Sequence, residues 1–159
     1  MKILIVSDTH GIHEYFKEVI RLTSPIDMLI HCGDTEGGED YMRSLAGCRS
    51  EFIAGNNDFF SNLPREANLT IGKYKAMLVH GHDYGISMGY EPLLEEALSR
   101  EADIVFFGHT HRPFLMRQKG VWLVNPGSLS FPRQGGRRPS FCIMDIDRFG
   151  EAHFTISYL

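Results

Sequence analysis

The sequence contains few cysteines and no long hydrophobic run, and both absences exclude classes of protein. The three cysteines, Cys32, Cys48 and Cys142, are odd in number and widely spaced, which fits neither a disulfide framework nor a zinc ribbon. The opening apolar run, in "MKILIVSDTH", is too short for the core of a signal peptide or for a membrane span. We therefore expect a cytoplasmic protein in a reducing compartment, with no membrane partner.

An excess of basic charge is also missing. The formal net charge is -4 at pH 7, which argues against a general nucleic-acid-binding surface. The sequence has no internal repeat, low-complexity tract or linker, and 159 residues is a length typical of one domain. We expect one domain over residues 1–159 that forms no stable complex with nucleic acid; a homo-oligomer is compatible with the sequence.

Apolar runs and amphipathic stretches alternate along the first two thirds of the chain. Three stretches have helical spacing, at residues 13–24, 39–47 and 90–102. Near-continuous apolar runs of strand length predict strands that are covered on both faces, at residues 3–6, 28–30, 52–54, 77–79 and 104–107. Together they predict a mixed α/β fold built in layers.

After Pro113 the pattern changes to alternating segments. "FLMRQKGVWLV" and "SFCIMDIDRFGEAHFTISYL" each contain a turn signal, so we expect two hairpins and an antiparallel second half. Between them lies the loop "FPRQGGRRPS". The guanidinium groups of Arg133, Arg137 and Arg138 are suited to binding phosphate, but a charged loop is usually only solvated, which is the interpretation we favour.

Each of the five apolar runs is followed by polar residues: "SDTH", "HCGD", "GNND", "HGHD" and "GHTH". In open α/β sheets the functional cleft lies beyond the carboxyl ends of the strands, so we expect these segments to converge. Singly, each has a structural explanation, such as a helix cap for Asp8 or Asp34, or a turn for "GNND". Five such coincidences in phase with five strands are improbable.

The chemistry of these side chains suits divalent metal ions. Carboxylate and amide oxygens combined with imidazoles favour Mn, Fe, Zn, Co or Ni over Ca. Two ions roughly 3.5–4 Å apart can hold a nucleophilic hydroxide and clamp both ends of an in-line displacement at phosphorus. The candidate ligands are numerous enough for two ions if one carboxylate bridges them: Asp8, His10, Asp34, Asn56, His80, His109 and His111.

Taken in order, "DTH", "GD", "GNND", "HGH" and "GHTH", with "NPGS" at Asn125 to Ser128, resemble the calcineurin-like metallophosphoesterase superfamily. Within it the sequence is most similar to the small YfcE-type phosphodiesterase branch of bacteria and archaea, over the whole chain. The resemblance implies a four-layer αββα sandwich of two mixed β-sheets flanked by helices. It also implies two metal ions, with Mn favoured. One would be bound by Asp8, His10 and His111, the other by Asn56, His80 and His109, and Asp34 would bridge them.

Three further residues beside the candidate ligands, Asn57, Asp58 and His82, are candidates for catalytic roles. The phosphatase branches of the superfamily have a histidine after the asparagine of the third motif, whereas this chain has Asn57, which cannot transfer a proton. His82 is then a candidate proton donor or substrate contact, or a hydrogen-bonded histidine behind the ligands.

Two neighbouring features carry weaker expectations. Phe59 and Phe60 follow "GNND" and are placed to wall a substrate pocket or to join a subunit interface, although packing in the core is the commoner outcome and the one we expect. Cys32 lies at the end of the second predicted strand and is expected to be an inert buried thiol.

The sequence therefore predicts a dinuclear metal-dependent phosphodiesterase that hydrolyses small phosphodiesters through a metal-bound hydroxide. Two alternatives stay open: a phosphomonoesterase of the same fold, and a non-catalytic interaction scaffold similar to the retromer-type subunit of this superfamily. Competent residues at all seven ligand positions favour an enzyme over a scaffold. A metallo-β-lactamase-like hydrolase is disfavoured because the sequence lacks an H-x-H-x-D-H run.

Overall fold

The computed structural model describes residues 1–159 and contains two five-stranded sheets. In the first sheet the strand order is β10 (Ala152–Tyr158), β9 (Ser140–Ile146), β1 (Lys2–Val6), β2 (Met28–His31) and β3 (Arg49–Phe52). In the second sheet it is β4 (Glu66–Ile71), β5 (Tyr74–Val79), β6 (Ile104–Phe106), β8 (Val121–Pro126) and β7 (Pro113–Gln118).

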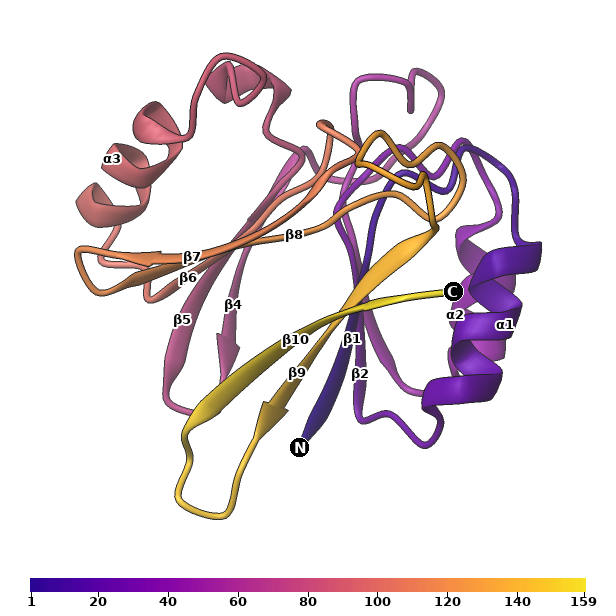
Figure 1. Cartoon of the computed structure of the whole chain (residues 1–159), viewed down its shortest axis with the longest axis horizontal. Coiled ribbons are helices and arrows are strands. Elements are labelled where there is room, and N and C mark those ends of the chain that lie inside the picture. Colours follow the sequence, from indigo (N-terminus) through magenta and orange to yellow (C-terminus); the bar gives the residue numbers. More distant parts are fainter.

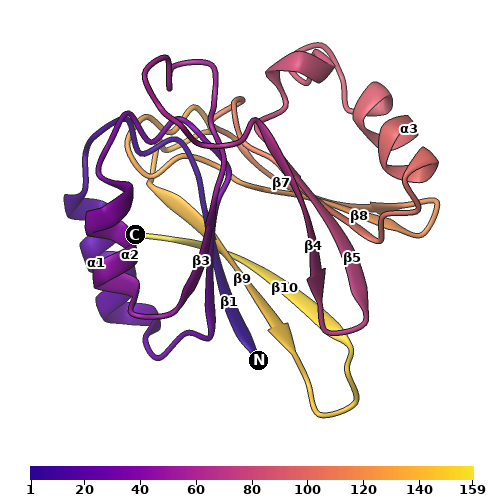
Figure 2. The same ribbon diagram turned by 180° about the vertical axis from the view of Figure 1, so that it is seen from behind.

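The two sheets pack against each other and carry helices on their outer faces (Figures 1 and 2). Helices α1 (Glu14–Thr23) and α2 (Glu39–Ala46) cover the first sheet, and α3 (Glu91–Ser99) covers the second. A short 3-10 helix, η1 (His82–Tyr84), follows β5. This arrangement confirms the predicted four-layer αββα sandwich. None of the helices has the length and hydrophobicity that a membrane crossing requires.

Strand β1 shows why the predicted strands are continuously apolar. Its successive side chains point to opposite faces of the sheet. Ile3 and Ile5 belong to the core between the two sheets, whereas Leu4 and Val6 belong to the core under α1 and α2. Both cores exclude water, so neither face of the strand accepts polar residues. A third core lies between the second sheet and α3.

The pairing of the strands corrects two expectations. Both predicted hairpins form, as β7–β8 and β9–β10, but the second half of the chain is not wholly antiparallel. Strand β8 lies parallel to β6, because it enters the second sheet between β6 and its own hairpin partner. The third strand spans Arg49–Phe52 rather than 52–54, since β3 is an edge strand whose outward residues are polar and therefore carry no continuous apolar signal.

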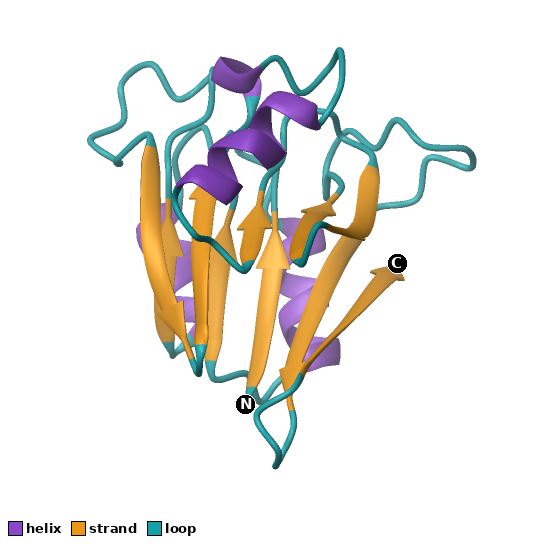
Figure 3. Cartoon of the chain, turned by 90° about the vertical axis from the view of Figure 1, so that its left-hand side faces the viewer, coloured by secondary structure: helices purple, strands orange, loops and turns teal.

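The parallel strands β1, β2 and β3 in one sheet and β5, β6 and β8 in the other end at the same edge of the sandwich (Figure 3). The loops that follow them are gathered at this edge, as expected for the functional edge of an open α/β sheet.

Candidate metal centre

All seven candidate ligands lie in the loops that follow parallel strands. The loops after β1, β2 and β3 contribute Asp8, His10, Asp34 and Asn56, and those after β5 and β6 contribute His80, His109 and His111. Four of them, Asp8, His10, Asp34 and His111, each offer a donor atom, and these atoms all lie within 4.8 Å of one another. The chain therefore brings carboxylates and imidazoles from both sheets to one place.

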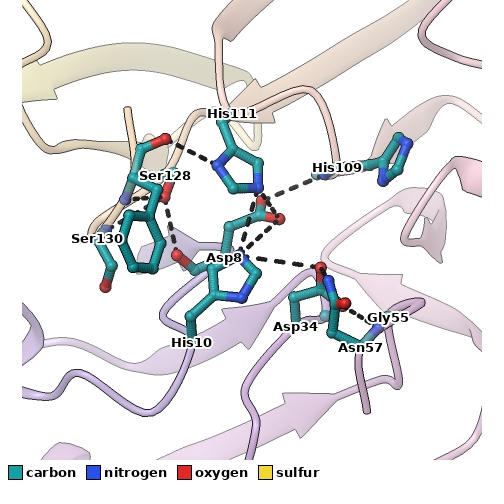
Figure 4. Close-up of polar contacts among 12 residues, drawn as sticks. Asp8, His10, Asp34, Gly55, Asn57, His109, His111, Ser128 and Ser130 are labelled. Carbon is teal, nitrogen blue, oxygen red and sulfur yellow. Dashed lines mark hydrogen bonds and ion pairs between the residues drawn. The ribbon is translucent and has the colours of Figure 1, made fainter. Parts of the chain in front are cut away.

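Asp8, His10 and His111 form what we call the first donor group (Figure 4). The Nε2 atom of His111 lies 3.1 Å from Oδ1 of Asp8 and 3.3 Å from Nε2 of His10. Nε2 of His10 lies 4.0 Å from Oδ1 of Asp8. Asp8 is fully buried and His111 nearly so, which leaves this group little contact with solvent.

Asn56, His80 and His109 form the second donor group. Oδ1 of Asn56 lies 3.1 Å from Nε2 of His80 and 2.9 Å from Nδ1 of His109. In Figure 4 the ring of His109 points away from Asp8, although its backbone N–H donates a hydrogen bond to that carboxylate over 3.2 Å. The side chains after β6 therefore serve both groups, His111 the first and His109 the second.

Asp34 lies between the two donor groups. Its Oδ2 atom is 4.0 Å from Nε2 of His10 and 3.4 Å from Nε2 of His80. Asp34 is 1% exposed, and both of its carboxylate oxygens accept hydrogen bonds from Asn57, one from the backbone N–H and one from the side-chain amide. Asp34 therefore lies beside residues of both donor groups.

Three imidazoles are oriented by acceptors on their far side. Nδ1 of His10 lies 2.6 Å from the Glu36 carboxylate, while Nδ1 of His80 and of His111 each lie 2.8 Å from a backbone carbonyl, that of Cys32 and of Phe131. A proton on Nδ1 donates to these acceptors, which leaves the lone pair of Nε2 directed at the cluster. This is how metal-binding histidines are held in proteins.

The loops adopt backbone conformations that are costly for residues with a side chain. Nine non-glycine residues have a positive φ, and five of them are candidate ligands: Asp8, His10, Asp34, His109 and His111. Such strain persists only where the surroundings enforce it, and it concentrates at functional sites. The glycines of the motifs allow close approach: a Cβ on Gly55 would lie 2.1 Å from Oδ1 of Asp34.

The electrostatics of the cluster suit a cation. Burial opposes ionisation of Asp34, but contacts with His80 and Asn57 hold its pKa well below the usual range. Burial also disfavours a charge on His80 and His111, yet the adjoining carboxylates of Asp34 and Asp8 raise the pKa of both imidazoles overall. Oδ1 of Asp8 is buried without a hydrogen bond. These oxygen and imidazole donors fit divalent metal ions, which would replace the protons on the imidazoles.

Comparison with known proteins identifies the family. The model of the calcineurin-like phosphoesterase superfamily domain matches residues 1–148. The chain belongs to this superfamily. A probable metallophosphoesterase of Bacillus subtilis, YsnB, is 33% identical over 148 residues, which cover 92% of this chain and 85% of the relative. The family supports a metal-dependent phosphoesterase that uses divalent ions, in agreement with the cluster of donor atoms.

Solved structures show the same fold. A predicted phosphoesterase from Streptococcus pneumoniae has a TM-score of 0.81 and 26% identity, covering 99% of this chain and 97% of that one. A Vps29 variant from Entamoeba histolytica has a TM-score of 0.80 at 24% identity and covers 100% and 99% of the two chains. An archaeal phosphodiesterase has a TM-score of 0.76 at 22% identity and covers 99% and 100%. The last two likenesses concern the fold alone.

The three candidate catalytic residues of this phosphoesterase lie in different surroundings. Asn57 binds Asp34, as described above. Asp58 is 8% exposed, and its carboxylate accepts hydrogen bonds from the backbone N–H groups of Thr35, Glu36 and Gly55 and from the Thr35 hydroxyl. It therefore ties the loops after β2 and β3 together.

His82 is more open, with 20% of its side chain exposed, and its ring centroid is 6.0 Å from that of His109. Its Nε2 atom lies 3.2 Å from a guanidinium nitrogen of Arg65 and 3.4 Å from the Asp83 carboxylate. Burial lowers the pKa of this imidazole. His82 thus lies beside the second donor group with a partly accessible side chain.

Several supporting residues are not singled out by the sequence reasoning. Glu36 carries no motif signal, although it orients His10. The "NPGS" motif is visible in the sequence, but its role is not: the Asn125 amide donates to the Gly108 carbonyl, and the Ser128 hydroxyl donates to the Asp8 carbonyl, both over 2.8 Å. The end of β8 thereby supports the loop after β6, and the loop after β8 supports the loop after β1.

The remaining expectations have mixed outcomes. Cys32 is fully buried, and burial raises the pKa of its thiol, as expected of an inert cysteine. The expectation that Phe59 and Phe60 pack in the core is wrong: they are 79% and 102% exposed. Both lie in the turn after Asn57 and Asp58, two residues whose hydrogen bonds hold this turn at the cluster. The two rings therefore lie outside the three cores.

Proposed function

We propose that this phosphoesterase is a dinuclear metal-dependent phosphodiesterase acting on small phosphodiesters. The observation that carries the proposal is the position of Asp34 between two complete donor groups, each with residues from both sheets. Asp8, His10 and His111 would hold one ion, Asn56, His80 and His109 the other, and Asp34 would contact both. When bound, such a pair supplies Lewis acidity toward the phosphoryl oxygens and lowers the pKa of water.

The residues around the ligands prepare the site for this task. Glu36 and the carbonyls of Cys32 and Phe131 fix the imidazoles, so the Nε2 atoms are directed inward before an ion arrives. Asn57 holds the Asp34 carboxylate through two hydrogen bonds. Pre-organisation of this kind lowers the cost of binding, because the ligands lose little freedom when the ion enters.

Asn57 also favours diesters with good leaving groups, such as aryl groups, over diesters of alcohols. Its amide cannot protonate a departing oxygen, and a general acid is typically worth about 10²–10⁴-fold in rate. His82 is our candidate for the proton donor, because its ring lies beside His109 and is partly exposed. Mn is the favoured ion, with Zn, Fe, Ni and Co as alternatives that the same donors accept.

A non-catalytic scaffold is the rival function, because the fold is shared with Vps29. The details of the cluster favour the enzyme. A protein-binding surface needs neither the strained backbone at five candidate ligands nor buried imidazoles oriented on their far side.

The test measures metal content and turnover together. Protein loaded with Mn and desalted should retain about two ions per chain, and it should hydrolyse bis(p-nitrophenyl) phosphate faster than p-nitrophenyl phosphate. Asp40→Asn, a change on the exposed face of α2, is the control and should behave as the parent. Two ions without hydrolysis of either ester would support the scaffold, faster hydrolysis of the monoester would support the phosphomonoesterase, and retention of well under one ion would refute the metal centre.

A further inference from the structure

A hollow adjoins the metal centre, and none of the seven candidate metal ligands lines it. Its volume is about 600 Å³, within the range of about 300–1,000 Å³ that is usual for small-molecule sites. Its walls come from the segment between η1 and α3, the loop after β6, and the start of β7. Its lining includes Ile86, Met88, Tyr90, Phe107, Thr110 and Phe114.

The hollow is tied to the metal centre by the chain itself. Phe107 lies two residues before His109, and Thr110 lies between His109 and His111. The rings of Phe107 and Tyr90 both neighbour that of Phe114, with centroid separations of 6.1 and 5.6 Å. An aromatic cluster therefore lies next to the loop that carries one candidate ligand from each donor group.

Two arginines line both the hollow and the mouth of the metal centre. Arg112 and Arg133 belong to the lining of the hollow and also to that of the cavity beside His10, His111 and Asn57. The backbone N–H of Arg133 donates to the His111 carbonyl over 2.9 Å, which places this residue at the cluster. Neither guanidinium forms an ion pair with a carboxylate, although the chain as a whole is acidic.

We propose that the hollow binds an aromatic esterifying group of the substrate, while Arg112 and Arg133 bind the phosphate to which that group is attached. The inference rests on the proposed function, because it takes the metal centre as the place of the phosphoryl group. The charge of the lining favours one kind of occupant. Two arginines without an ion-pair partner line both cavities, and they favour an anion where the cavities meet. The rings of Tyr90 and Phe114 favour a flat apolar group beyond it.

This arrangement assigns the arginines a role that differs from the sequence-based expectation. Arg133 is exposed, as expected of a solvated loop, but its loop folds back on the cluster instead of extending away from it. Arg138 lies apart from the hollow, where its guanidinium donates to the Leu159 carbonyl. Of the arginines in this loop, Arg133 is therefore the one that lines both the hollow and the cavity at the metal centre.

The experiment measures binding without turnover. Phenylphosphonate and methylphosphonate are not cleaved, because their P–C bond is not an ester, and their affinities for Mn-loaded protein are measured by calorimetry. We expect phenylphosphonate to bind about tenfold more tightly, which corresponds to about 1.4 kcal/mol. Tyr90→Ala should bring the ratio of the two affinities close to one and leave methylphosphonate binding unchanged. Arg112→Ala should weaken the binding of both by a similar factor.

Tyr15→Ala, at an exposed tyrosine of α1, is the matched control and should keep the parent ratio. Equal affinities of the two phosphonates for the parent protein would overturn the proposal, and so would a ratio that Tyr90→Ala leaves unchanged. Failure of the proposed function would give a different result: the protein would not hydrolyse diesters, but it would still bind phenylphosphonate more tightly than methylphosphonate.

Discussion

His10 illustrates how a single exposed carboxylate supports a buried cluster. Glu36 holds Nδ1 of His10 at 2.6 Å, and its side chain is 41% exposed, so it contributes orientation and little core packing. The candidate ligands differ in this respect: His80 and His111 are oriented by backbone carbonyls, which a substitution cannot remove. Glu36 is therefore the orienting group that mutation can test.

Replacing Glu36 by alanine should weaken Mn binding by about 10–100-fold, the usual effect of removing a residue that orients a ligand. Glu36→Gln keeps an acceptor for His10 and should have a smaller effect. Calorimetric titration of metal-free protein with Mn measures both. Thermal unfolding in EDTA should be almost unchanged in either variant, and equal Mn affinities of Glu36→Ala and the parent would show that His10 needs no such support.

Asp34→Asn should be more damaging than Asn56→Ala. The first change removes the negative charge from the residue that lies beside both donor groups, whereas the second loosens one group. Each tenfold loss of rate is about 1.4 kcal/mol of transition-state stabilisation, and we expect Asp34→Asn to lose several such factors. Mn content and diester turnover are compared in the two variants. Near-normal values in Asp34→Asn would refute the bridging assignment.

His31, buried beneath the cluster, should make stability depend on pH. Its Nδ1 accepts from the Gly33 N–H and its Nε2 faces the Thr9 hydroxyl, so the neutral ring satisfies both atoms. Burial lowers its pKa to about 4. The unfolded chain therefore binds a proton that the folded chain excludes, and this contribution to stability is complete above about pH 6.5 and decreases as the pH falls toward 4.

Denaturant unfolding of metal-free protein should reveal this as a contribution of up to about 1.4 kcal/mol per pH unit between pH 6.5 and 4. His31→Gln should be less stable at pH 7 and should show a flatter dependence across the same interval. The difference between the two proteins isolates His31 from the carboxylates that titrate in this range. Parallel pH profiles would mean that His31 is not the source.

At the level of the elements, Asp58 links the loop after β2 to the loop after β3. Its carboxylate accepts four hydrogen bonds, three from backbone N–H groups and one from the Thr35 hydroxyl. The loop after β2 carries Asp34, the candidate bridging ligand, and the loop after β3 carries Asn56 of the second donor group. The position of the ligands thus depends on a residue whose own oxygens are already occupied.

Asp58→Ala should reduce the free energy of unfolding by about 2–3 kcal/mol, because it leaves buried N–H donors without acceptors. Asp58→Asn keeps one acceptor oxygen and should lose less. Denaturant unfolding in EDTA measures stability, and diester turnover is followed in parallel. A stable Asp58→Ala protein with abolished turnover would instead support the catalytic role for which the sequence makes Asp58 a candidate.

For the whole molecule, the cluster joins the two sheets. Each donor group combines residues that follow strands of the first sheet with residues that follow strands of the second. Bound ions would therefore cross-link the two halves of the sandwich at one edge, while the apolar core holds them together along their length.

Metal removal should consequently lower the thermal midpoint. At a free Mn concentration of 100 times Kd, one ion stabilises the folded state by about 2.7 kcal/mol. For a chain of this size about 1 kcal/mol corresponds to roughly 2–4 °C, so we expect a decrease of about 5–10 °C per ion in EDTA. Calorimetric scans of the loaded and stripped protein measure it, and the Asp34→Asn protein should show little difference between the two. Identical midpoints for the loaded and stripped parent would contradict the cross-link.

The sequence by itself determined the layered fold and the residues of the cluster, because both depend on local signals. Continuous apolar runs mark strands that are buried on two faces, and polar residues directly after them must lie at the strand ends. Dependence on local signals also explains why the predicted third strand is misplaced: β3 is an edge strand with polar outward residues, so it has no continuous apolar run.

Only the tertiary structure decided how those residues meet and what supports them. His10 and His111 contact each other across 101 residues of sequence, and Ser128 supports the Asp8 carbonyl across 120. Four further features arise in the same way: the parallel pairing of β8, the orientation of His10 by Glu36, the four donors on Asp58, and the exposure of Phe59 and Phe60. Each depends on which loops are packed side by side, and that is set by the pairing of strands far apart in the chain.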